Sequence, residues 1–331
     1  MLTTPTTEDI RSKFNIFLAG PIQGVHDWQS KLAKEFEGYQ DVAFFSPRRA
    51  ELKEFDYNEQ VEWECEHLQY ADLIVFCIPP EDYDVAGRYY AQTTIYEFSE
   101  WMQFRNCKKD ILVSIDNSYP LFKYILKRNP ELTIYTEQEL KDKIKEKIEE
   151  FKARKPKIFF TSDTHFNQQR TLELSINRRL FLDLNEMNSV LITNWNNEIT
   201  NKDIVYHLGD FGDYEFRKYL KGNIRLILGN YEEKDIENSQ SAESIKKYGF
   251  ESVQRNTILK INNLRIHLSH KPSEFDKTAD FNLFGHIHGR QQVKKFGLDV
   301  GVDAQNFAPI DLDTVLRFKD AYKYYDNEVW C

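Results

Sequence analysis

The sequence lacks the features that mark secreted and membrane-spanning proteins. It has 4 cysteines among 331 residues, and no two of them form a CxxC pair, which argues against a disulfide framework or a thiolate zinc site. The opening residues, MLTTPTTEDIRSKF, have neither the charged start nor the apolar core of a signal peptide, and no later apolar run approaches the length of a membrane span. We therefore expect a soluble, cytoplasmic protein with no membrane partner.

Positive charge is also in deficit. The 44 Lys and Arg residues face 53 Asp and Glu residues, and the formal net charge of −9 argues against a broad basic surface for duplex nucleic acid. A small anionic substrate remains compatible with this balance, because backbone N–H groups or bound cations can reverse the field inside one cleft. Hydrophobic residues make up 41% of the chain, so wholesale disorder is excluded, and the length predicts about two domains.

A charged segment divides the chain into two α/β regions. After an expected flexible tail over 1–12, residues 13–135 alternate apolar runs (FNIFLA, VAFFSP, LIVFCIP, DILVSID) with helical stretches at 60–70 and 94–104. This alternation predicts a parallel, doubly wound (Rossmann-like) sheet. Residues 136–156 carry Leu140, Ile144 and Ile148 at helical spacing, which predicts a closing helix and a linker, or alternatively a partner-binding helix. The second domain is expected over 157–331.

In the second region, five apolar runs end in side chains that can bind a metal. These are Asp163 and His165, then Asp210, then Asn230, then His270, and finally His286 and His288. Because strand ends in a packed α/β structure converge on one edge, these oxygen and nitrogen donors could meet there. The mixture suits divalent transition ions, and a pair of ions needs a bridging carboxylate. His207 and His267 lie inside apolar runs, and we assign them to strand packing.

These motifs resemble those of the calcineurin-like metallophosphoesterases from Lys157 to about Phe318. The matching segments are DTH, GDFGD, GN, SHKP and GHIH, and flanking text such as TSDTHF, NWN and GVD is similar to one bacterial and phage branch. The resemblance implies an αββα sandwich with two divalent ions (Mn, Fe, Zn, Ni or Mg) and phosphoester hydrolysis. It implies that one ion is held by Asp163, His165 and His288, that Asp210 bridges, and that Asn230, His270 and His286 hold the other.

One position departs from that family pattern. Its usual GNH reads here as GNY, so Tyr231 stands where relatives have a histidine that protonates the leaving oxygen. A neutral tyrosine is a weaker acid than imidazolium, which penalises poor leaving groups most. We therefore favour phosphodiesters as substrates, with Tyr231 as a weak proton donor or a substrate-facing ring. After DTHF, Asn167 and Gln168 replace the Gly-His of many relatives.

The first region carries a possible glycosyl-transfer site. Gly20 and Gly24 in FLAGPIQG would let the backbone approach a ribose or phosphate closely. An ordinary β–α turn can contain the same glycine pattern. Glu97 follows the hydroxyl pair Thr93 and Thr94 in AQTTIYEF. A carboxylate beside an anomeric carbon can act as a nucleophile. Taken singly, Glu97 also fits a solvated helix residue.

A fourth polar position in this region precedes an apolar run. Asp72 stands at the expected mouth of LIVFCIP, where it could protonate a departing base, or it could simply cap a helix end. From Phe14 to about Asp116 the chain resembles the nucleoside 2-deoxyribosyltransferase-like group in FLAGPI, QVEWE, AD and TTIYEF. The resemblance implies Glu97 as nucleophile, Asp72 as the base-binding acid and a possible homo-oligomer. Phe17 replaces a tyrosine that orients the glutamate in several relatives.

Together these patterns favour a bifunctional enzyme of nucleotide metabolism acting on a small nucleoside or nucleotide. The first domain would cleave or transfer an N-glycosidic bond, and the second would hydrolyse a phosphoester or phosphodiester. One alternative is the degradation of a cyclic or ADP-ribose-type nucleotide signal. Another is a metallophosphodiesterase controlled by a nucleotide-sensing, non-catalytic first domain, which the Phe17 exchange favours.

Overall fold

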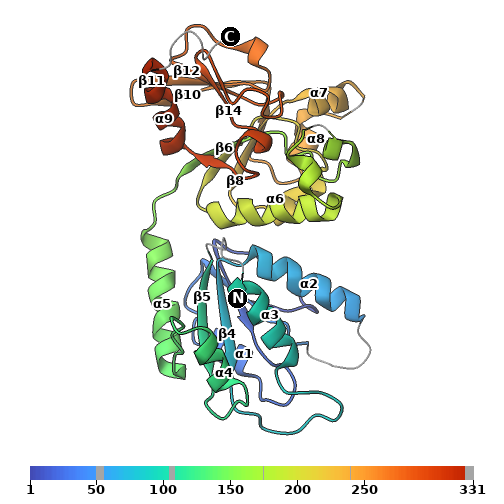
Figure 1. Ribbon diagram of the computed structural model, residues 1–331, viewed down its shortest axis with the longest axis vertical. Helices are drawn as coiled ribbons and strands as arrows, with labels where there is room; N and C mark the ends of the chain where they lie inside the picture. Colours follow the sequence, from blue (N-terminus) through green and yellow to red (C-terminus); the bar gives the residue numbers. More distant parts are fainter. Residues whose placement is uncertain (50–55, 104–108, 174, 239, 325–331) are drawn as a thin grey trace. The chain divides into compact units, whose positions relative to one another are not determined.

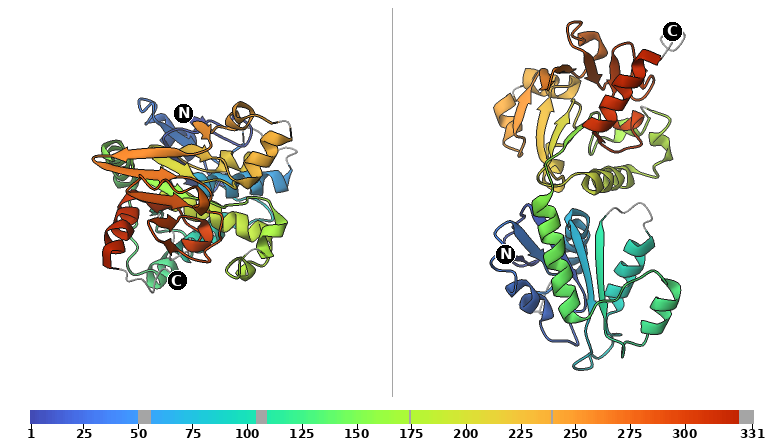
Figure 2. Two further views of the ribbon diagram at one scale, coloured as in Figure 1. Left: turned by 90° about the horizontal axis from the view of Figure 1, so that it is seen from above. Right: turned by 90° about the vertical axis from the view of Figure 1, so that its left-hand side faces the viewer.

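The chain folds into two compact units, 1–154 and 155–331. The computed structural model describes residues 1–49, 56–103, 109–173, 175–238 and 240–324 (Figures 1 and 2). None of the helices in these ranges has the length and apolar character needed to cross a membrane. Cys65 and Cys77 are free thiols, whereas Cys107 and Cys331 lie outside the described residues.

The first unit is built on a five-stranded sheet with the order β1-β3-β2-β4-β5, in which all neighbours are parallel. The strands are β1 (Leu2–Thr3), β2 (Phe14–Ala19), β3 (Val42–Phe45), β4 (Leu73–Ile78) and β5 (Asp110–Ile115). Every residue of β2 and β3 is buried, as expected for central parallel strands covered on both faces. The predicted parallel sheet is confirmed.

Helices cover both faces of this sheet (Figure 1). They are α1 (Trp28–Lys34), α2 (Tyr57–Tyr70), α3 (Gln92–Gln103), α4 (Phe122–Arg128) and α5 (Glu137–Ala153). One apolar cluster joins α1 and α5 to β2 residues such as Ile16, and the other joins α2, α3 and α4 to the opposite face through Phe17. The loops that follow the strands lie at the edge of the sheet where the strands end.

The first residues are not a flexible tail, so that expectation is wrong. β1 pairs with β3, with Leu2 opposite Phe44, and Thr3 is fully buried. Arg11 forms ion pairs with Asp9 and with Glu66 of α2. A two-residue strand is too short to show a period of two, so no sequence pattern announces it.

α5 closes the first unit. It begins with a capping box formed by Thr136 and Glu139, and it buries Leu140, Ile144, Ile148 and Phe151 in the cluster shared with α1. Because its apolar stripe already lies in this core, the helix has no comparable stripe left for a partner, and the closing-helix interpretation describes it.

The second unit contains two further five-stranded sheets, with the orders β15-β6-β7-β8-β9 and β10-β11-β12-β14-β13. The first comprises β15 (Ile310–Asp311), β6 (Ile158–Thr161), β7 (Ile204–His207), β8 (Asn223–Ile227) and β9 (Ser252–Gln254). The second comprises β10 (Thr257–Ile261), β11 (Leu264–Leu268), β12 (Phe281–Phe284), β14 (Gly297–Asp299) and β13 (Val293–Lys294). Strands β6 to β9 run parallel, as do β11, β12 and β14.

One apolar cluster joins the two sheets of the second unit. It contains Phe160 and Leu208 from the first sheet side and Leu268 and Leu283 from the second, together with Val315 of α9 (Leu312–Ala321). The other face of the first sheet packs on α6 (Leu184–Glu198) and α8 (Ala242–Lys246). α7 (Asn230–Glu237) follows β8. The second unit is therefore mixed α/β. The metal-capable residues predicted from the sequence directly follow β6, β7, β8, β11 and β12.

Candidate functional sites

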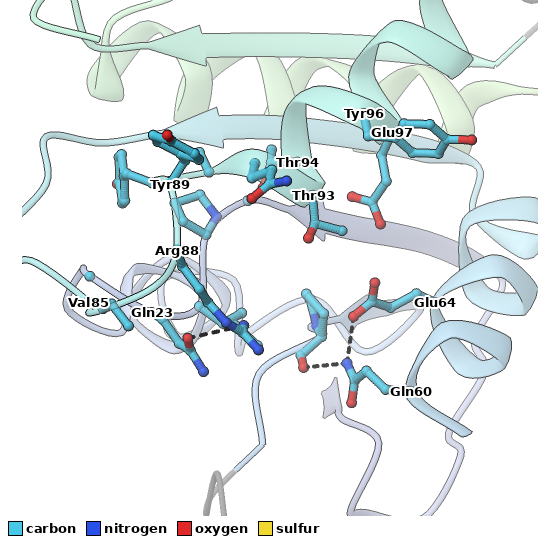
Figure 3. Close-up of a pocket in the computed structure, with 18 of the residues that line it drawn as sticks. Gln23, Gln60, Glu64, Val85, Arg88, Tyr89, Thr93, Thr94, Tyr96 and Glu97 are labelled. Atoms are coloured by element: carbon cyan, nitrogen blue, oxygen red, sulfur yellow. Dashed lines mark hydrogen bonds between the residues drawn. The ribbon is translucent and has the colours of Figure 1, made fainter. Parts of the chain in front are cut away.

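The first unit has a cavity of about 500 Å³ at the carboxyl edge of its sheet (Figure 3). Parallel α/β sheets bind ligands at this edge. The walls come from the loops after β2, β3 and β4 and from α2 and α3. They include Gly20, Gly24, Gln60, Glu64, Thr93, Thr94 and Glu97. The structure thus brings together the predicted glycines, threonines and Glu97.

Both predicted glycines of this cavity are required by their surroundings. A Cβ at Gly20 would lie 2.3 Å from the carbonyl oxygen of Cys77 and 2.5 Å from the Trp28 ring. Gly24 has a φ of +76°, in the left-handed region that side chains disfavour. The chain after β2 can therefore pass close to β4, and it leaves the cavity open beside the loop.

Two carboxyl groups meet inside the cavity. Glu97 on α3 and Glu64 on α2 both line the cavity, and Figure 3 shows the two side chains turned toward each other. Burial raises the pKa of Glu97 well above its ordinary value, and the neighbouring charge of Glu64 acts in the same direction. Burial also raises the pKa of Glu64. The two groups therefore tend to keep a proton between them.

Glu64 is held in place by a short polar chain. Gln60, one turn earlier on α2, donates from Nε2 to Glu64 Oε1 at 2.5 Å and to the carbonyl oxygen of Pro47 at 2.9 Å. Gln60 Oε1 in turn accepts from Arg49. The sequence pattern had given Glu64 no role. Glu64 lies four residues after Gln60 in QVEWE, so both side chains share one helix face, and this spacing could have indicated the Gln60–Glu64 hydrogen bond.

Asp72 does not line this cavity, and its position contradicts the predicted role of base-binding acid. It precedes β4, whose other end reaches the cavity, so it stands at the opposite, amino edge of the sheet. Its Oδ2 accepts hydrogen bonds from the backbone and side-chain nitrogens of Asn15 at 2.8 and 3.2 Å. A residue before a parallel strand lies on the edge away from the ligand site, so the position predicted for Asp72, before its strand, does not suit the role of base-binding acid.

In the second unit, the structure brings together all the predicted metal ligands. They follow β6 (Asp163, His165), β7 (Asp210), β8 (Asn230), β11 (His270) and β12 (His286, His288). Two subsets have ligand atoms within 4.8 Å of one another: Asp163, His165 and His288, and Asp163, Asp210 and His270. The remaining two join them, because His286 Nδ1 lies 3.0 Å from Asn230 Nδ2 and 3.2 Å from His270 Nε2.

The ligand-bearing backbone is strained. Left-handed φ angles occur at Asp163 (58°), His165 (50°), Asp210 (55°), His286 (72°) and His288 (51°). A non-glycine residue in that region costs on the order of 1–3 kcal/mol when the surroundings impose it, and such residues cluster at functional sites. The loops therefore aim these side chains at one point at the expense of local stability.

Two polar atoms at this point have no partner. Asp163 Oδ1 and His165 Nε2 are buried without a hydrogen bond, and they lie 3.9 Å apart. His288 Nε2 is likewise 3.9 Å from Asp163 Oδ1. These separations are too long for hydrogen bonds, and buried unsatisfied polar atoms are costly. A cation among the three would satisfy them, so the donor set fits a metal.

Three imidazoles are oriented through their Nδ1 atoms. His165 Nδ1 contacts Gln168 Oε1 at 2.8 Å, His270 Nδ1 contacts the Leu208 carbonyl oxygen at 2.8 Å, and His288 Nδ1 contacts Asp303 Oδ2 at 2.9 Å. Each of these acceptors favours a proton on Nδ1, which would leave Nε2 as the atom able to bind a cation. Gln168, noted only as a departure from relatives, therefore has a contact at the site.

Charges within the metal-free cluster balance one another. Burial alone would lower the pKa of His270, but its hydrogen bond to Asp210 and the charges of Asp163 and Asp210 raise that pKa to about 9. Burial would raise the pKa of Asp210, but the hydrogen bond and charge of His270 lower it to about 2. Burial lowers the pKa of His165 to about 4, so this ring is neutral and able to bind a cation.

Tyr231 and Glu232 flank the ligand Asn230. The Tyr231 ring meets His165 edge to face at 5.2 Å between centroids, and its backbone nitrogen donates to Asp210 Oδ1 at 3.0 Å. Glu232 is fully buried and accepts from the backbone nitrogens of Asp210, Phe211 and Gly229, each at 2.8 Å. Glu232 thus clamps the loop that carries Asp210, a role that its place in GNYE alone does not reveal.

The two histidines of the second unit that were not predicted as ligands pack within strands, as expected. His207 of β7 is fully buried with Nε2 at 2.9 Å from Thr164 Oγ1, and His267 of β11 contacts Asn282 Oδ1 at 3.2 Å.

Comparison with known proteins bears on the first unit. Residues 13–117 match the family model described as Nucleoside 2-deoxyribosyltransferase like. The N-terminal unit is therefore nucleoside 2-deoxyribosyltransferase-like over these residues. The match lies wholly outside the second unit, so the metal-site interpretation rests on the side chains described above.

Two further similarities concern proteins without an assigned function. The chain is 29% identical over 179 residues to the uncharacterized protein MJ1445 of Methanocaldococcus jannaschii, a match that covers 49% of this chain and 90% of that protein. A crystal structure of the protein of unknown function AQ665 from Aquifex aeolicus aligns over 49% of this chain and 99% of that one, with 20% identity and a TM-score of 0.40.

Proposed function

We propose that this chain is a bifunctional enzyme of nucleotide metabolism. The first unit cleaves or transfers the N-glycosidic bond of a nucleoside or nucleotide, and the second is a metallophosphoesterase of the αββα type that hydrolyses phosphodiesters. The observation that carries the second activity is the convergence of the metal-capable side chains on the orphaned Asp163 Oδ1 and His165 Nε2. The family match supports the first activity.

In the second unit, Asp163, His165 and His288 would hold one divalent ion, Asp210 would bridge, and Asn230, His270 and His286 would hold the other. Bound ions of this kind supply an activated water for attack on phosphorus and neutralise the phosphoryl oxygens. The chain's own part is orientation, since Gln168, Leu208 and Asp303 fix three of the rings. Tyr231, beside His165, faces the substrate or serves as a weak acid for the leaving oxygen.

In the first unit, Glu97 is the nucleophile and Glu64 the acid and base. Substrate binding moves the shared proton to Glu64, and the Glu97 carboxylate bonds to the anomeric carbon while the C–N bond breaks and Glu64 protonates the departing base. Water then attacks the same carbon, gives its proton to Glu64 and releases Glu97. The exposed rings of Tyr57, Tyr89 and Tyr96 at the cavity offer stacking surfaces for a base.

Two variants of the full-length protein test this proposal. Purified with Mn²⁺, the wild type should release free base from a panel of 2′-deoxynucleosides and their 5′-monophosphates, and it should cleave bis-p-nitrophenyl phosphate. Glu97→Ala should abolish base release and keep diester cleavage, and Asp210→Asn should do the reverse. If the wild type leaves the whole panel unchanged, or if each variant removes both activities, the proposal fails. Cyclic nucleotides and ADP-ribose are tested alongside this panel, and their turnover in place of the panel compounds would favour destruction of a nucleotide signal.

A nucleotide-sensing first unit is the second candidate, and the burial of Phe17 favours it. Phe17 is fully buried against Trp63 and has no hydroxyl with which to orient Glu97. If Glu97→Ala leaves ligand binding and all turnover intact, sensing replaces catalysis for this unit.

A further inference from the structure

Arg178 is a fully buried cation that lies next to the metal-capable cluster. It belongs to a short 3-10 segment, Arg178–Leu180, which none of the recognised motifs covers. Its guanidinium binds Asp303 in a bidentate manner, with Nε donating to Oδ1 and Nη2 donating to Oδ2, each at 2.8 Å. Nη2 also donates to the main-chain carbonyl oxygen of Asp163.

Asp303 extends this contact to a second ligand. Its Oδ2 accepts from His288 Nδ1 at 2.9 Å, and its Oδ1 also accepts from Ser175 Oγ. Arg178 therefore touches the backbone of Asp163 directly and the ring of His288 through one carboxylate. Among the described residues, the hydrogen bonds of Arg178 and Asp303 reach Asp163 and His288 but none of Asp210, Asn230, His270 and His286.

A buried ion pair is an expensive way to stabilise a fold. Removing two charges from water costs several kcal/mol per ion, and well-packed apolar side chains often serve stability as well or better. The bidentate geometry supplies orientation instead, because a planar guanidinium fixes both oxygens of a carboxylate. Here the oriented carboxylate sets the rotation of His288, and the remaining donor pins the turn at Asp163, where φ is left-handed.

We propose that Arg178 is the positioning residue for one of the two cation sites. Acting through Asp303, it builds the site formed by Asp163, His165 and His288 and leaves the site around Asp210, His270 and His286 unaffected. This inference rests on the proposed dinuclear centre. Outer contacts to metal-binding histidines typically change metal affinity by about 10- to 100-fold. Arg178 reaches two predicted ligands of the same site, Asp163 directly and His288 through Asp303.

The test counts Mn²⁺ on the full-length protein. Wild type, Arg178→Met and Arg178→Lys are loaded with Mn²⁺, dialysed and analysed by plasma mass spectrometry, with electron paramagnetic resonance to separate coupled ion pairs from isolated ions. Arg179→Met is the matched control, because Arg179 is the next residue, of the same type, and exposed. We expect two equivalents and a coupled spectrum for wild type and Arg179→Met. Arg178→Met should retain about one equivalent with the spectrum of an isolated ion, and its second affinity should fall by about 10- to 100-fold.

Other outcomes would overturn the inference. Two tightly bound equivalents in a folded Arg178→Met show that Arg178 is dispensable for the site, and the loss of both equivalents with a native circular dichroism spectrum contradicts the selectivity for one site. If Arg178→Met does not fold, the isosteric Asp303→Asn decides by the same count. A wild type that binds no Mn²⁺ refutes the dinuclear proposal itself, a result distinct from a variant that keeps both ions.

Discussion

At the residue scale, the second unit concentrates locally unfavourable features at one point. Left-handed backbone at Asp163, His165 and Asp210 coincides there with orphaned polar atoms. Each feature lowers the stability of the isolated chain, and a bound cation would compensate for the unsatisfied atoms. Side chains that are held in one direction at the expense of local stability are typical of functional sites.

The clustering of the seven metal-capable side chains could be predicted from the sequence because each follows an apolar run. Arg178 and Asp303 could not, since they are 125 residues apart and meet only through the fold. Glu64 was missed for the same reason, because its partner Glu97 lies on another helix. Asp72 was correctly placed before its strand, but the role of base-binding acid does not fit that position, because the other end of β4 reaches the cavity.

A pH-dependent stability difference is expected for Glu97→Gln. The folded-state pKa of Glu97 is raised above its ordinary value of 4.5, so its contribution to stability is complete below that value and is lost as pH rises through the raised pKa. Glutamine does not titrate. The unfolding midpoint of Glu97→Gln minus that of wild type, measured by calorimetry, should therefore increase from about pH 4 to about pH 8. A difference that stays flat with pH for Glu97→Gln would refute the raised pKa.

Gly285→Ala should damage the metal cluster. A Cβ there would lie 2.1 Å from Ser162 Oγ and 2.2 Å from Asp163 Oδ2, so the aspartate must move. We expect a loss of about 1–3 kcal/mol in urea unfolding together with weaker Mn²⁺ binding. Gly38→Ala, with nothing within 4 Å of its added Cβ, is the control for the exchange itself. Unchanged Mn²⁺ affinity in Gly285→Ala would show that Asp163 is not a ligand.

At the scale of elements, the periodicity of apolar residues predicted the long helix α5 and missed the short strand β1. The stripe Leu140, Ile144 and Ile148 predicted α5 correctly, because three turns of helix repeat the same signal. β1 escaped notice, since its two residues gain their place from pairing with β3 rather than from their own pattern. The apolar runs of β2 and β4 predicted the parallel sheet, and their burial on both faces explains why these runs do not alternate.

Ile144→Ala tests whether α5 is part of the first unit's core. Ile144 is fully buried in the cluster that includes Ile16, so its truncation should cost about 2–5 kcal/mol in the free energy of unfolding. Lys145→Ala, half-exposed on the next position of the helix, should change stability by less than about 0.5 kcal/mol. Equal, small effects of both substitutions in urea titrations would mean that α5 is not held in this core.

At the scale of the whole molecule, two different site chemistries are carried by separate units. The first is a carboxyl pair in a cavity beside a parallel sheet, and the second is a histidine-rich cluster beside two sheets that share a core. The family match covers only the first. The expected homo-oligomer stays a prediction.

Removal of metal should destabilise the second unit selectively. A ligand that binds only the folded state stabilises it by about 2.7 kcal/mol at a free concentration of 100 times its dissociation constant. With excess chelator, the calorimetric transition of the second unit should shift to lower temperature, and the transition of the first unit should not move. The Glu97→Ala variant should show the same shift as wild type. A chelator effect on both transitions, or on neither, would contradict this assignment.

We propose that side chains from five loops of the second unit enclose a pair of cations. Diffraction from crystals grown with Mn²⁺, recorded near the manganese absorption edge, tests this arrangement. We expect two anomalous peaks among Asp163, His165, Asp210, Asn230, His270, His286 and His288. An anomalous map without peaks at these residues, or with manganese bound elsewhere on the chain, would contradict it.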